Sequence, residues 1–207
     1  MCRRESGGPE GPMTDLWQLP KSATFGGETY EIRSDFRDIL KILTALEDPE
    51  LPELLRWQVA LQLFYPKPIP DSYCRQAMEF LCDFIAAGES AAPGPRLLDW
   101  KQDAPVIVAE VNKVAGREIR EAPFIHWWTF LGWFHAIGSG QLATLVSIRQ
   151  KLRTGKRLED WEQEFYRQNR KKVDLPKRRT AEEQAQIHRL NQLLAGTAPA
   201  SQKGGIQ

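Results

Sequence analysis

The feature that most constrains the fold is an aromatic run in the middle of the chain, residues 124–134, which reads FIHWWTFLGWF. It holds three of the seven tryptophans and three of the nine phenylalanines of the chain. At 100° per residue the run predicts a helix that is apolar around most of its circumference, which is typical of a core helix. An aromatic surface for a ligand or protein is the alternative. With His126 and Thr129 inside it, the run is too short to span a bilayer, which takes about 20 apolar residues.

Length and composition predict one globular domain. The chain has 207 residues, of which 42% are hydrophobic and 27% charged, enough to bury a sizeable core. We expect a helical domain with an N-terminal hairpin over residues 16–175, and a subdivision near 88–95, rich in Gly, Ala, Ser and Pro, is the alternative to a single unit. Residues 1–15 are expected to form a disordered extension, and 176–207 a C-terminal helix followed by a disordered tail.

The three cysteines, Cys2, Cys74 and Cys82, show no pairing pattern. Cys74 and Cys82 fall on one predicted helix, where a rise of about 1.5 Å per residue separates their Cα atoms by roughly 12 Å, too far for a disulfide. They are therefore expected to be reduced, buried thiols of a cytosolic protein. Residues 1–12 lack the apolar stretch of a signal peptide, so no export is expected.

A hairpin and three helices are predicted in the first half of the chain. Gly26-Gly27 between two β-prone segments is typical of a hairpin turn. Ser34 stands where an N-cap is expected, before apolar residues at helical spacing, Phe36, Ile39, Leu40 and Leu43. The next helix is expected to begin at Asp48 and to bury the stripe Leu51, Leu54, Leu55, Val59 and Leu63. Residues 73–85 predict a third, broadly buried helix that contains Phe80 and Phe84.

The second half is predicted to be helical as well. Residues 103–115 predict a helix despite their β-branched side chains, because the apolar residues at 107, 111 and 114 have helical spacing. Farther along, one face of an amphipathic helix that we expect to dock through aromatic side chains is marked by Leu158, Trp161 and Phe165. Thr180 and Glu183 form a capping box for a last helix. The fold class is therefore mainly α, a multi-helix globular fold of about seven or eight helices with a short N-terminal β-hairpin.

None of the residue types that commonly carry catalysis occurs in a catalytic arrangement in the sequence, so we expect no enzyme. His126 and His135 point to opposite faces of their helix and cannot share a metal ion. No Gly-rich phosphate loop is present. Cys74 and Cys82 fall among apolar helix positions rather than in the electropositive setting of a nucleophile. We therefore expect no catalytic residue, no cofactor and no metal site.

A basic stretch runs from Arg149 to Arg179, with twelve Lys and Arg against five acids. It could engage phosphates, and such binding would weaken steeply with salt. Acids interrupt it, however, and no DNA-reading motif accompanies it, so a solvated or protein-docking surface is favoured over a nucleic-acid site. The net charge of +1 adds no global field.

Three motifs stand in a fixed order along the chain. YEIRSDFR (residues 30–37) follows the Gly-Gly turn, HWWTF (126–130) lies in the middle, and YRQNR (166–170) lies near the end. In this combination the chain, from residue 16 to residue 175, resembles the bacteriophage "gene product fifteen" family of siphophage tail modules. Residues 104–117 lack the tyrosine-rich character of the corresponding helix in that family.

The resemblance implies a non-catalytic tail assembly chaperone in the cytoplasm of the bacterial host. Such a protein would bind the tape measure protein during assembly, with the tail-tube protein as a candidate second partner, and would be absent from the finished tail. A tape measure helix exposes apolar stripes, which an aromatic-bearing helical surface could cover. The alternatives are a structural tail or head–tail component retained in the virion and a basic nucleic-acid-binding phage protein.

Two sets of residues follow for the sites. The candidates for partner binding lie on the amphipathic helix and are Trp161, Phe165, Tyr166 and Arg170. No membrane contact is expected, and nucleic acid is disfavoured. The structural core is predicted to contain Phe36, Leu40, Phe80, Phe84, Trp127, Trp128, Phe130, Leu131 and Phe134.

Overall fold

The computed structural model describes residues 17–87 and 94–176 of the chain. Within these ranges the fold is mainly α, as predicted, with seven α-helices and a two-stranded antiparallel hairpin. Some predictions lie outside the described residues: the N-terminal extension 1–15, most of the 88–95 segment, and the capped helix that starts at Thr180. Cys2 and His188 lie outside them as well.

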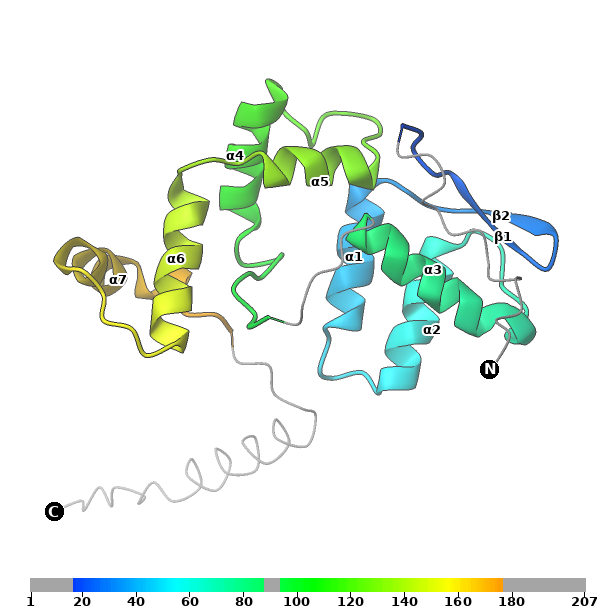
Figure 1. Ribbon diagram of the computed structural model, residues 1–207, viewed down its shortest axis with the longest axis horizontal. Helices are drawn as coiled ribbons and strands as arrows, with labels where there is room; N and C mark the ends of the chain where they lie inside the picture. Colours follow the sequence, from blue (N-terminus) through cyan, green and yellow to red (C-terminus); the bar gives the residue numbers. More distant parts are fainter. Residues whose placement is uncertain (1–16, 88–93, 177–207) are drawn as a thin grey trace, which may run out of the picture.

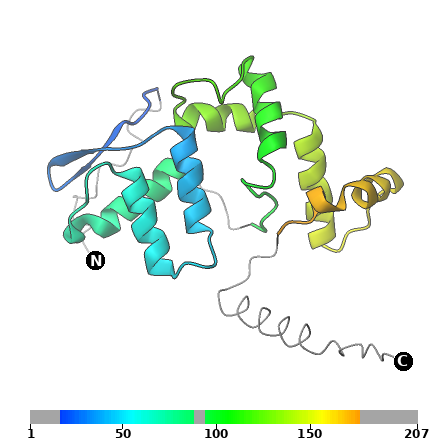
Figure 2. The ribbon, with the colours of Figure 1, turned by 180° about the vertical axis from the view of Figure 1, so that it is seen from behind.

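The elements follow one another along an elongated body (Figure 1), with the hairpin and the first three helices at one end and the last two helices at the other. The hairpin consists of β1 (Ser22–Phe25) and β2 (Glu28–Glu31), joined by Gly26 and Gly27, which both have positive φ as the predicted turn requires. The helices are α1 (Phe36–Leu46), α2 (Glu53–Phe64), the 3₁₀ turn η1 (Asp71–Tyr73), α3 (Cys74–Ala86), α4 (Ala104–Ala115), α5 (Trp127–His135), α6 (Gln141–Arg153) and α7 (Asp160–Val173). Seen from behind (Figure 2), α4 and α5 again lie between the two ends.

Helix α1 lies where it was predicted, but its N-cap is different. Asp35, not Ser34, caps it, because the Asp35 carboxylate accepts the Arg37 N–H at 3.0 Å. Ser34 is buried, and its carbonyl oxygen accepts the Trp127 N–H at 2.7 Å. Serine and aspartate are both good N-cap residues. The long-range hydrogen bond between Ser34 and Trp127 holds Ser34 before the helix and leaves the cap position to the next residue.

Helix α2 begins at Glu53, not at Asp48, whose carboxylate instead accepts the Glu50 N–H at 2.9 Å in a turn. The predicted buried stripe is therefore wrong at its start: Leu54 is 80% exposed and Leu55 is exposed too. The fully buried residues of the helix are Ala60 and Phe64. The predicted stripe is counted from residue 51, which lies before the helix, so its first positions do not match the buried side.

The cysteines are less buried than predicted. Cys74 is half-buried, and Cys82 is exposed on the outer side of α3. The side of α3 that faces the core carries Ala77, Phe80 and Phe84 instead. The expectation of a buried thiol is therefore wrong for Cys82, because its side of α3 faces away from the core.

The main core joins the hairpin to α1–α5. Of the residues predicted for it, five are buried: Phe36, Phe80, Phe84, Trp127 and Phe130. The other four are partly buried and pack against the same cluster: Leu40, Trp128, Leu131 and Phe134. The aromatic run thus lies in the middle of the fold, as its composition predicted.

A smaller second cluster holds α6 and α7 together. It consists of Leu145, Ile148, Leu158 and Val173, and Phe165 and Tyr166 pack against it. The separation into two clusters places α7 at the far end of the molecule from the hairpin (Figure 1). Burial of these side chains sets the orientation of α7, whose other sides face solvent.

A buried arginine fixes α7 to the rest of the molecule. Arg149 on α6 holds the Asp103 carboxylate with Nη1 and Nη2 at 2.7 and 2.8 Å. Its Nε donates to the Val173 carbonyl at 2.8 Å, Nη2 also donates to the Lys172 carbonyl at 2.6 Å, and Nη1 also donates to the Leu97 carbonyl at 3.0 Å. All five guanidinium N–H groups therefore have acceptors. One side chain satisfies the last-turn carbonyls of α7 and joins them to the N-terminus of α4.

We predict that Arg149→Met lowers the free energy of unfolding by about 3–5 kcal/mol, because it leaves the buried Asp103 carboxylate without its cation. Urea denaturation measures the loss. Arg153→Met, on the same helix but exposed, is the matched control and should change stability by no more than about 0.5 kcal/mol. An Arg149 variant as stable as the Arg153 variant would contradict the role of Arg149 as a clamp.

Candidate partner-binding surface

The start of α7 is held by two glutamates and a lysine. Glu159 and Glu162 form a capping box, in which the Glu162 carboxylate accepts the Glu159 N–H at 2.8 Å. Lys151 from α6 donates to both oxygens of Glu162 at 2.7 Å. The hydrogen bond from Lys151, together with the Glu159 N–H, lowers the pKa of Glu162, so this buried carboxylate stays charged. Glutamate rather than Ser or Thr stands at the cap, so the usual capping-box pattern does not include it, although the spacing of the two glutamates signals it.

Trp161 stands in the first turn of α7 and is 55% exposed. Its indole Nε1 donates to the Glu159 carboxylate at 2.8 Å, so the ring is held in one orientation at the surface. The three residues predicted to mark one docking face, 158, 161 and 165, therefore differ in exposure. Leu158 is buried and Phe165 half-buried, whereas Trp161 faces outward.

Tyr166 and Arg170, the other two candidates, meet at the end of α7. The Tyr166 hydroxyl donates to Asp174 Oδ1 at 2.9 Å, and Arg170 Nε donates to Asp174 Oδ2 at 3.2 Å. The hydrogen bond to Asp174 raises the pKa of the Tyr166 phenol. The structure thus brings Phe165, Tyr166 and Arg170 along one helix, with Trp161 one turn before them and more exposed than the two neighbouring aromatic side chains.

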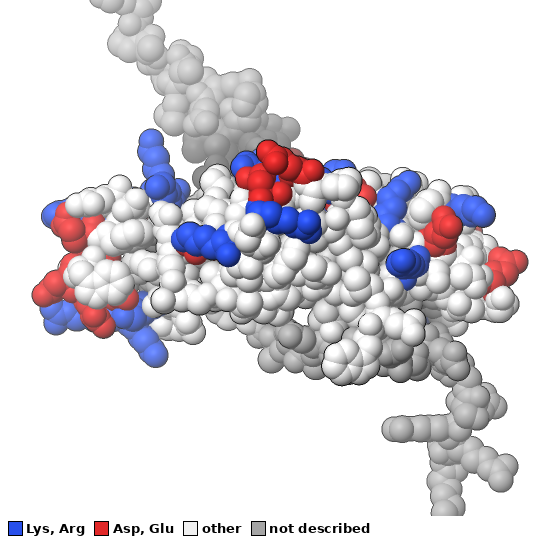
Figure 3. Space-filling model, turned by 90° about the horizontal axis from the view of Figure 1, so that it is seen from above, with Lys and Arg blue, Asp and Glu red and all other residues white. Residues whose placement is uncertain are grey.

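Charges on the surface are mixed rather than gathered by sign. On the face seen in Figure 3, Lys and Arg side chains alternate with Asp and Glu. Within the predicted basic stretch, four basic side chains are paired with carboxylates: Arg149 with Asp103, Lys151 with Glu162, Arg167 with Glu164, and Arg170 with Asp174. Ion pairs therefore engage part of the positive charge that the sequence suggested for phosphates.

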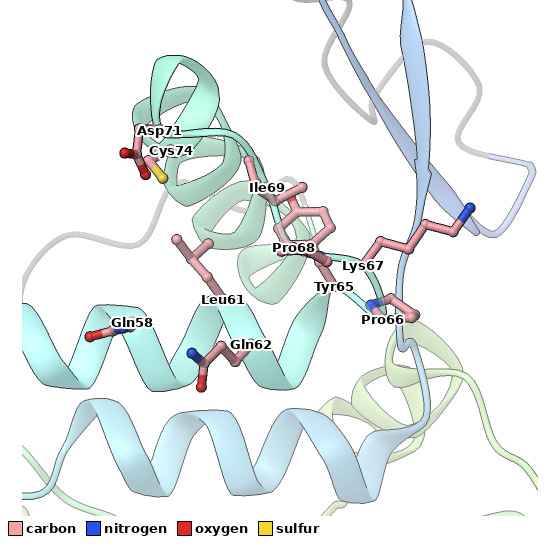
Figure 4. Close-up of a pocket in the computed structure, with 10 residues that line it drawn as sticks. All are labelled: Gln58, Leu61, Gln62, Tyr65, Pro66, Lys67, Pro68, Ile69, Asp71 and Cys74. Carbon is pink, nitrogen blue, oxygen red and sulfur yellow. The ribbon is translucent and has the colours of Figure 1, made fainter.

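A cavity of about 340 Å³ lies between α2 and the start of α3. Figure 4 shows Gln62 on one side and Asp71 and Cys74 on the other. The Tyr65 hydroxyl donates to the Ala77 carbonyl at 3.2 Å, and burial raises the pKa of this phenol. Among the described residues no base is hydrogen-bonded to Cys74, as a nucleophile would need. The described residues that line this cavity therefore do not pair a nucleophile with a base.

Within residues 17–87 and 94–176, no three side chains of His, Cys, Asp or Glu are grouped so as to hold a metal ion. None of the helices in that part of the chain has the length and apolarity to cross a membrane.

The first two of the three motifs, residues 30–37 and 126–130, pair with each other in space. Asp35 and His126 form an isolated antiparallel bridge, with Phe36 N–H donating to the Ile125 carbonyl at 2.9 Å. Besides capping α1, Asp35 accepts the Ile125 N–H at 3.1 Å and two bonds from the Arg37 guanidinium. Burial raises the pKa of Asp35, but these hydrogen bonds outweigh it, so the pKa lies below its usual value. Asp35 therefore caps α1 and also binds the backbone just before α5.

His126 caps the other helix of the pair. Its Nδ1 accepts the Trp128 N–H at 3.1 Å, and Nε2 lies 3.0 Å from the Pro20 carbonyl, so the neutral ring carries its proton on Nε2. Burial lowers the pKa of His126; the bond to Pro20 partly offsets this, and the Lys21 charge adds to it. A protonated ring could not accept at Nδ1, so the cap requires the neutral form.

The paired tryptophans close the end of a third helix. Trp127 Nε1 donates to the Ile85 carbonyl at 2.9 Å, and Trp128 Nε1 donates to the Phe84 carbonyl at 2.8 Å. Carbonyls in the last turn of a helix have no partner within it, so these two indoles complete the C-terminus of α3. The HWW motif is therefore a structural junction, and none of its polar atoms is offered to a ligand.

We predict a loss of stability as the pH falls below about 6.5, the ordinary pKa of histidine. The unfolded chain binds this proton more readily than the folded one, so the contribution is complete above that pH and declines below it. In His126→Asn the cap acceptor remains but the titrating group is gone, so urea midpoints between pH 7 and 5 should lose this slope. Protonation of Asp35 causes a separate loss of stability at lower pH, below the usual pKa of 3.8 for this group. An unchanged slope in the Asn variant would assign the titration to another group.

Comparison with known proteins agrees with the resemblance of the motifs. The family model described as Bacteriophage Gp15 protein matches residues 14–175, which contain all three motifs and the whole described helical fold up to Leu175. Neither the curated proteins nor the solved structures contain a match. The chain therefore belongs to the Bacteriophage Gp15 protein family.

Proposed function

We propose that this phage protein acts, without catalysis, as a tail assembly chaperone that binds the tape measure protein through α7. Membership of the phage family supports a role in the phage, and the finer role rests on the motifs that resemble tail chaperones. The cytoplasm of the bacterial host, where tails are assembled, is the compartment that fits this role. The tail-tube protein is the candidate second partner.

The observation that carries the proposal is Trp161. A tryptophan that is 55% exposed and fixed by a hydrogen bond to Glu159 presents a large apolar surface at little cost in side-chain entropy. Its anchor is rigid as well, because the capping box and Lys151 hold the first turn of α7. Tryptophan is among the residues that contribute most to binding energy at interfaces.

The rest of α7 suits an amphipathic helical partner. Phe165, four residues after Trp161, lies on the same side of α7 and is half-buried, whereas Arg170, nine residues after Trp161, lies on the opposite, polar side. An apolar track with a polar rim is how grooves and helix faces recognise an amphipathic helix. A tape measure helix has such apolar stripes before the tube polymerises around it, so covering them would prevent aggregation.

The pairing of basic side chains disfavours the nucleic-acid alternative. Arg149 is buried against Asp103, and Lys151 is committed to Glu162. Binding of DNA at these positions would have to break ion pairs that stabilise the fold. Retention on DNA should accordingly be weak at physiological salt.

We predict that Trp161→Ala weakens capture of the tape measure protein at least about 30-fold, the equivalent of about 2 kcal/mol. Stability to urea should change by no more than about 0.5 kcal/mol, because the side chain is largely in solvent. The measurement is affinity capture and sizing of the complex after co-expression with the tape measure protein of the same phage.

Leu54→Ala is the matched control, since Leu54 is an exposed apolar side chain on α2 at the other end of the molecule. It should leave capture unchanged. Equal capture by the Trp161 and Leu54 variants would refute the α7 surface, and unfolding of the Trp161 variant would show a structural role. Finding the chain in purified virions, with no complex formed, would favour the retained structural component instead.

A further inference from the structure

A groove runs along the outer side of α1, on a different part of the molecule from the α7 surface. Two hollows with volumes of about 530 and 400 Å³ form it. Both are lined by the same four residues, Thr44, Asp48, Trp100 and Lys101. Because they share these residues, the hollows make one continuous groove.

The floor of the groove is apolar and rigid. Leu40 and Leu51 line it together with Trp100. The Trp100 ring is held from behind by the core, with its centroid 6.3 Å from the Trp127 ring and 5.3 Å from the Phe134 ring. A fixed aromatic wall beside aliphatic side chains suits an apolar stripe more than a polar ligand.

The described chain ends at this groove. Pro176 lines the second hollow, and Arg96 Nη1 donates to its carbonyl oxygen at 3.0 Å. Gln102, another lining residue, donates from Nε2 to the Asp174 carbonyl at 3.1 Å. The residues that follow Pro176 therefore start beside the groove and are tethered to it.

The sequence after Pro176 has the pattern that the groove would accept. Residues 177–207 remain, and Ile187, Leu190 and Leu194 recur at i, i+3 and i+7 after the capping box. A helix over residues 180–195 would be about 24 Å long, whereas α1 is about 16 Å long, at about 1.5 Å per residue. The apolar stripe from residue 187 to residue 194 would span about 11 Å, which covers about two thirds of the length of α1.

Asp48 and Lys101 each line both hollows, so the groove holds charge of both signs. The sequence after Pro176 also carries both signs, with basic residues 177–179 followed by the acidic pair 182–183.

We propose that the groove along α1 binds residues 180–194 of the same chain, with Ile187, Leu190 and Leu194 against Leu40 and Trp100. Tethering at Pro176 makes this an intramolecular event with a high effective concentration, so modest contacts are sufficient. In the free protein the segment covers an apolar surface that is separate from the α7 surface.

The test uses the full chain and two complementary variants. Leu190→Asp/Leu194→Asp should shift the NMR resonance of the Trp100 indole N–H and the amides of Thr44 and Lys101, because the segment leaves the groove. In the reverse direction, Thr44→Glu should speed amide hydrogen exchange of residues 187–194 at least about tenfold. Thr44 is exposed in the last turn of α1 and glutamate is a good helix former, so the fold should persist.

Gln192→Asp, on the opposite side of the predicted helix, is the control and should leave the groove resonances unchanged. Groove resonances that stay in place in the double Asp variant would overturn the proposal. If they move when the wild-type protein is diluted tenfold, a second copy occupies the groove, which also overturns docking within one molecule. If the segment becomes protected only when the tape measure protein is added, the groove is empty in the free protein and the proposal is wrong.

Discussion

The fold depends on the pairing of two helix starts, Asp35 with His126. Each residue caps its own helix, and each backbone segment bonds the other, through Phe36 N–H to the Ile125 carbonyl and Trp127 N–H to the Ser34 carbonyl. The first N–H groups of a helix have no partner within it. Because α1 and α5 begin side by side, the caps of both helices lie in the same junction. This junction orients α1 against α5, and the rest of the core is arranged around it.

The junction also explains why the aromatic motif is so dense. Trp127 and Trp128 have to reach the carbonyls at the end of α3 with their indole nitrogens while their rings fill the core. The tryptophan side chains of the motif are therefore committed to contacts within the fold. Partner binding is left to another part of the molecule, and α7, joined to the body by Arg149 and the second cluster, carries the exposed Trp161.

Periodicity and turn chemistry predicted the hairpin, the helices and most of the buried aromatic side chains, because these signals are local. They failed where a distant contact decides. Leu54 and Leu55 read as buried but face solvent, and Ser34 read as a cap but pairs with Trp127. The clamp formed by Arg149 and Asp103 joins residues 46 positions apart, so no local pattern reveals it. At the candidate site, the capping box of α7 is a local pattern of two glutamates three residues apart, which the Ser or Thr rule for caps does not cover.

The central claim is that the HWW motif builds the fold while α7 meets the partner. Amide hydrogen exchange, measured on the full chain with and without the tape measure protein, tests both halves at once. The account predicts that residues 34–37 and 125–128 exchange slowly in both states, and that residues 160–170 gain protection only in the complex. Protection gained at 125–128, with no change at 160–170, would show that the motif itself is the binding surface and would contradict the account.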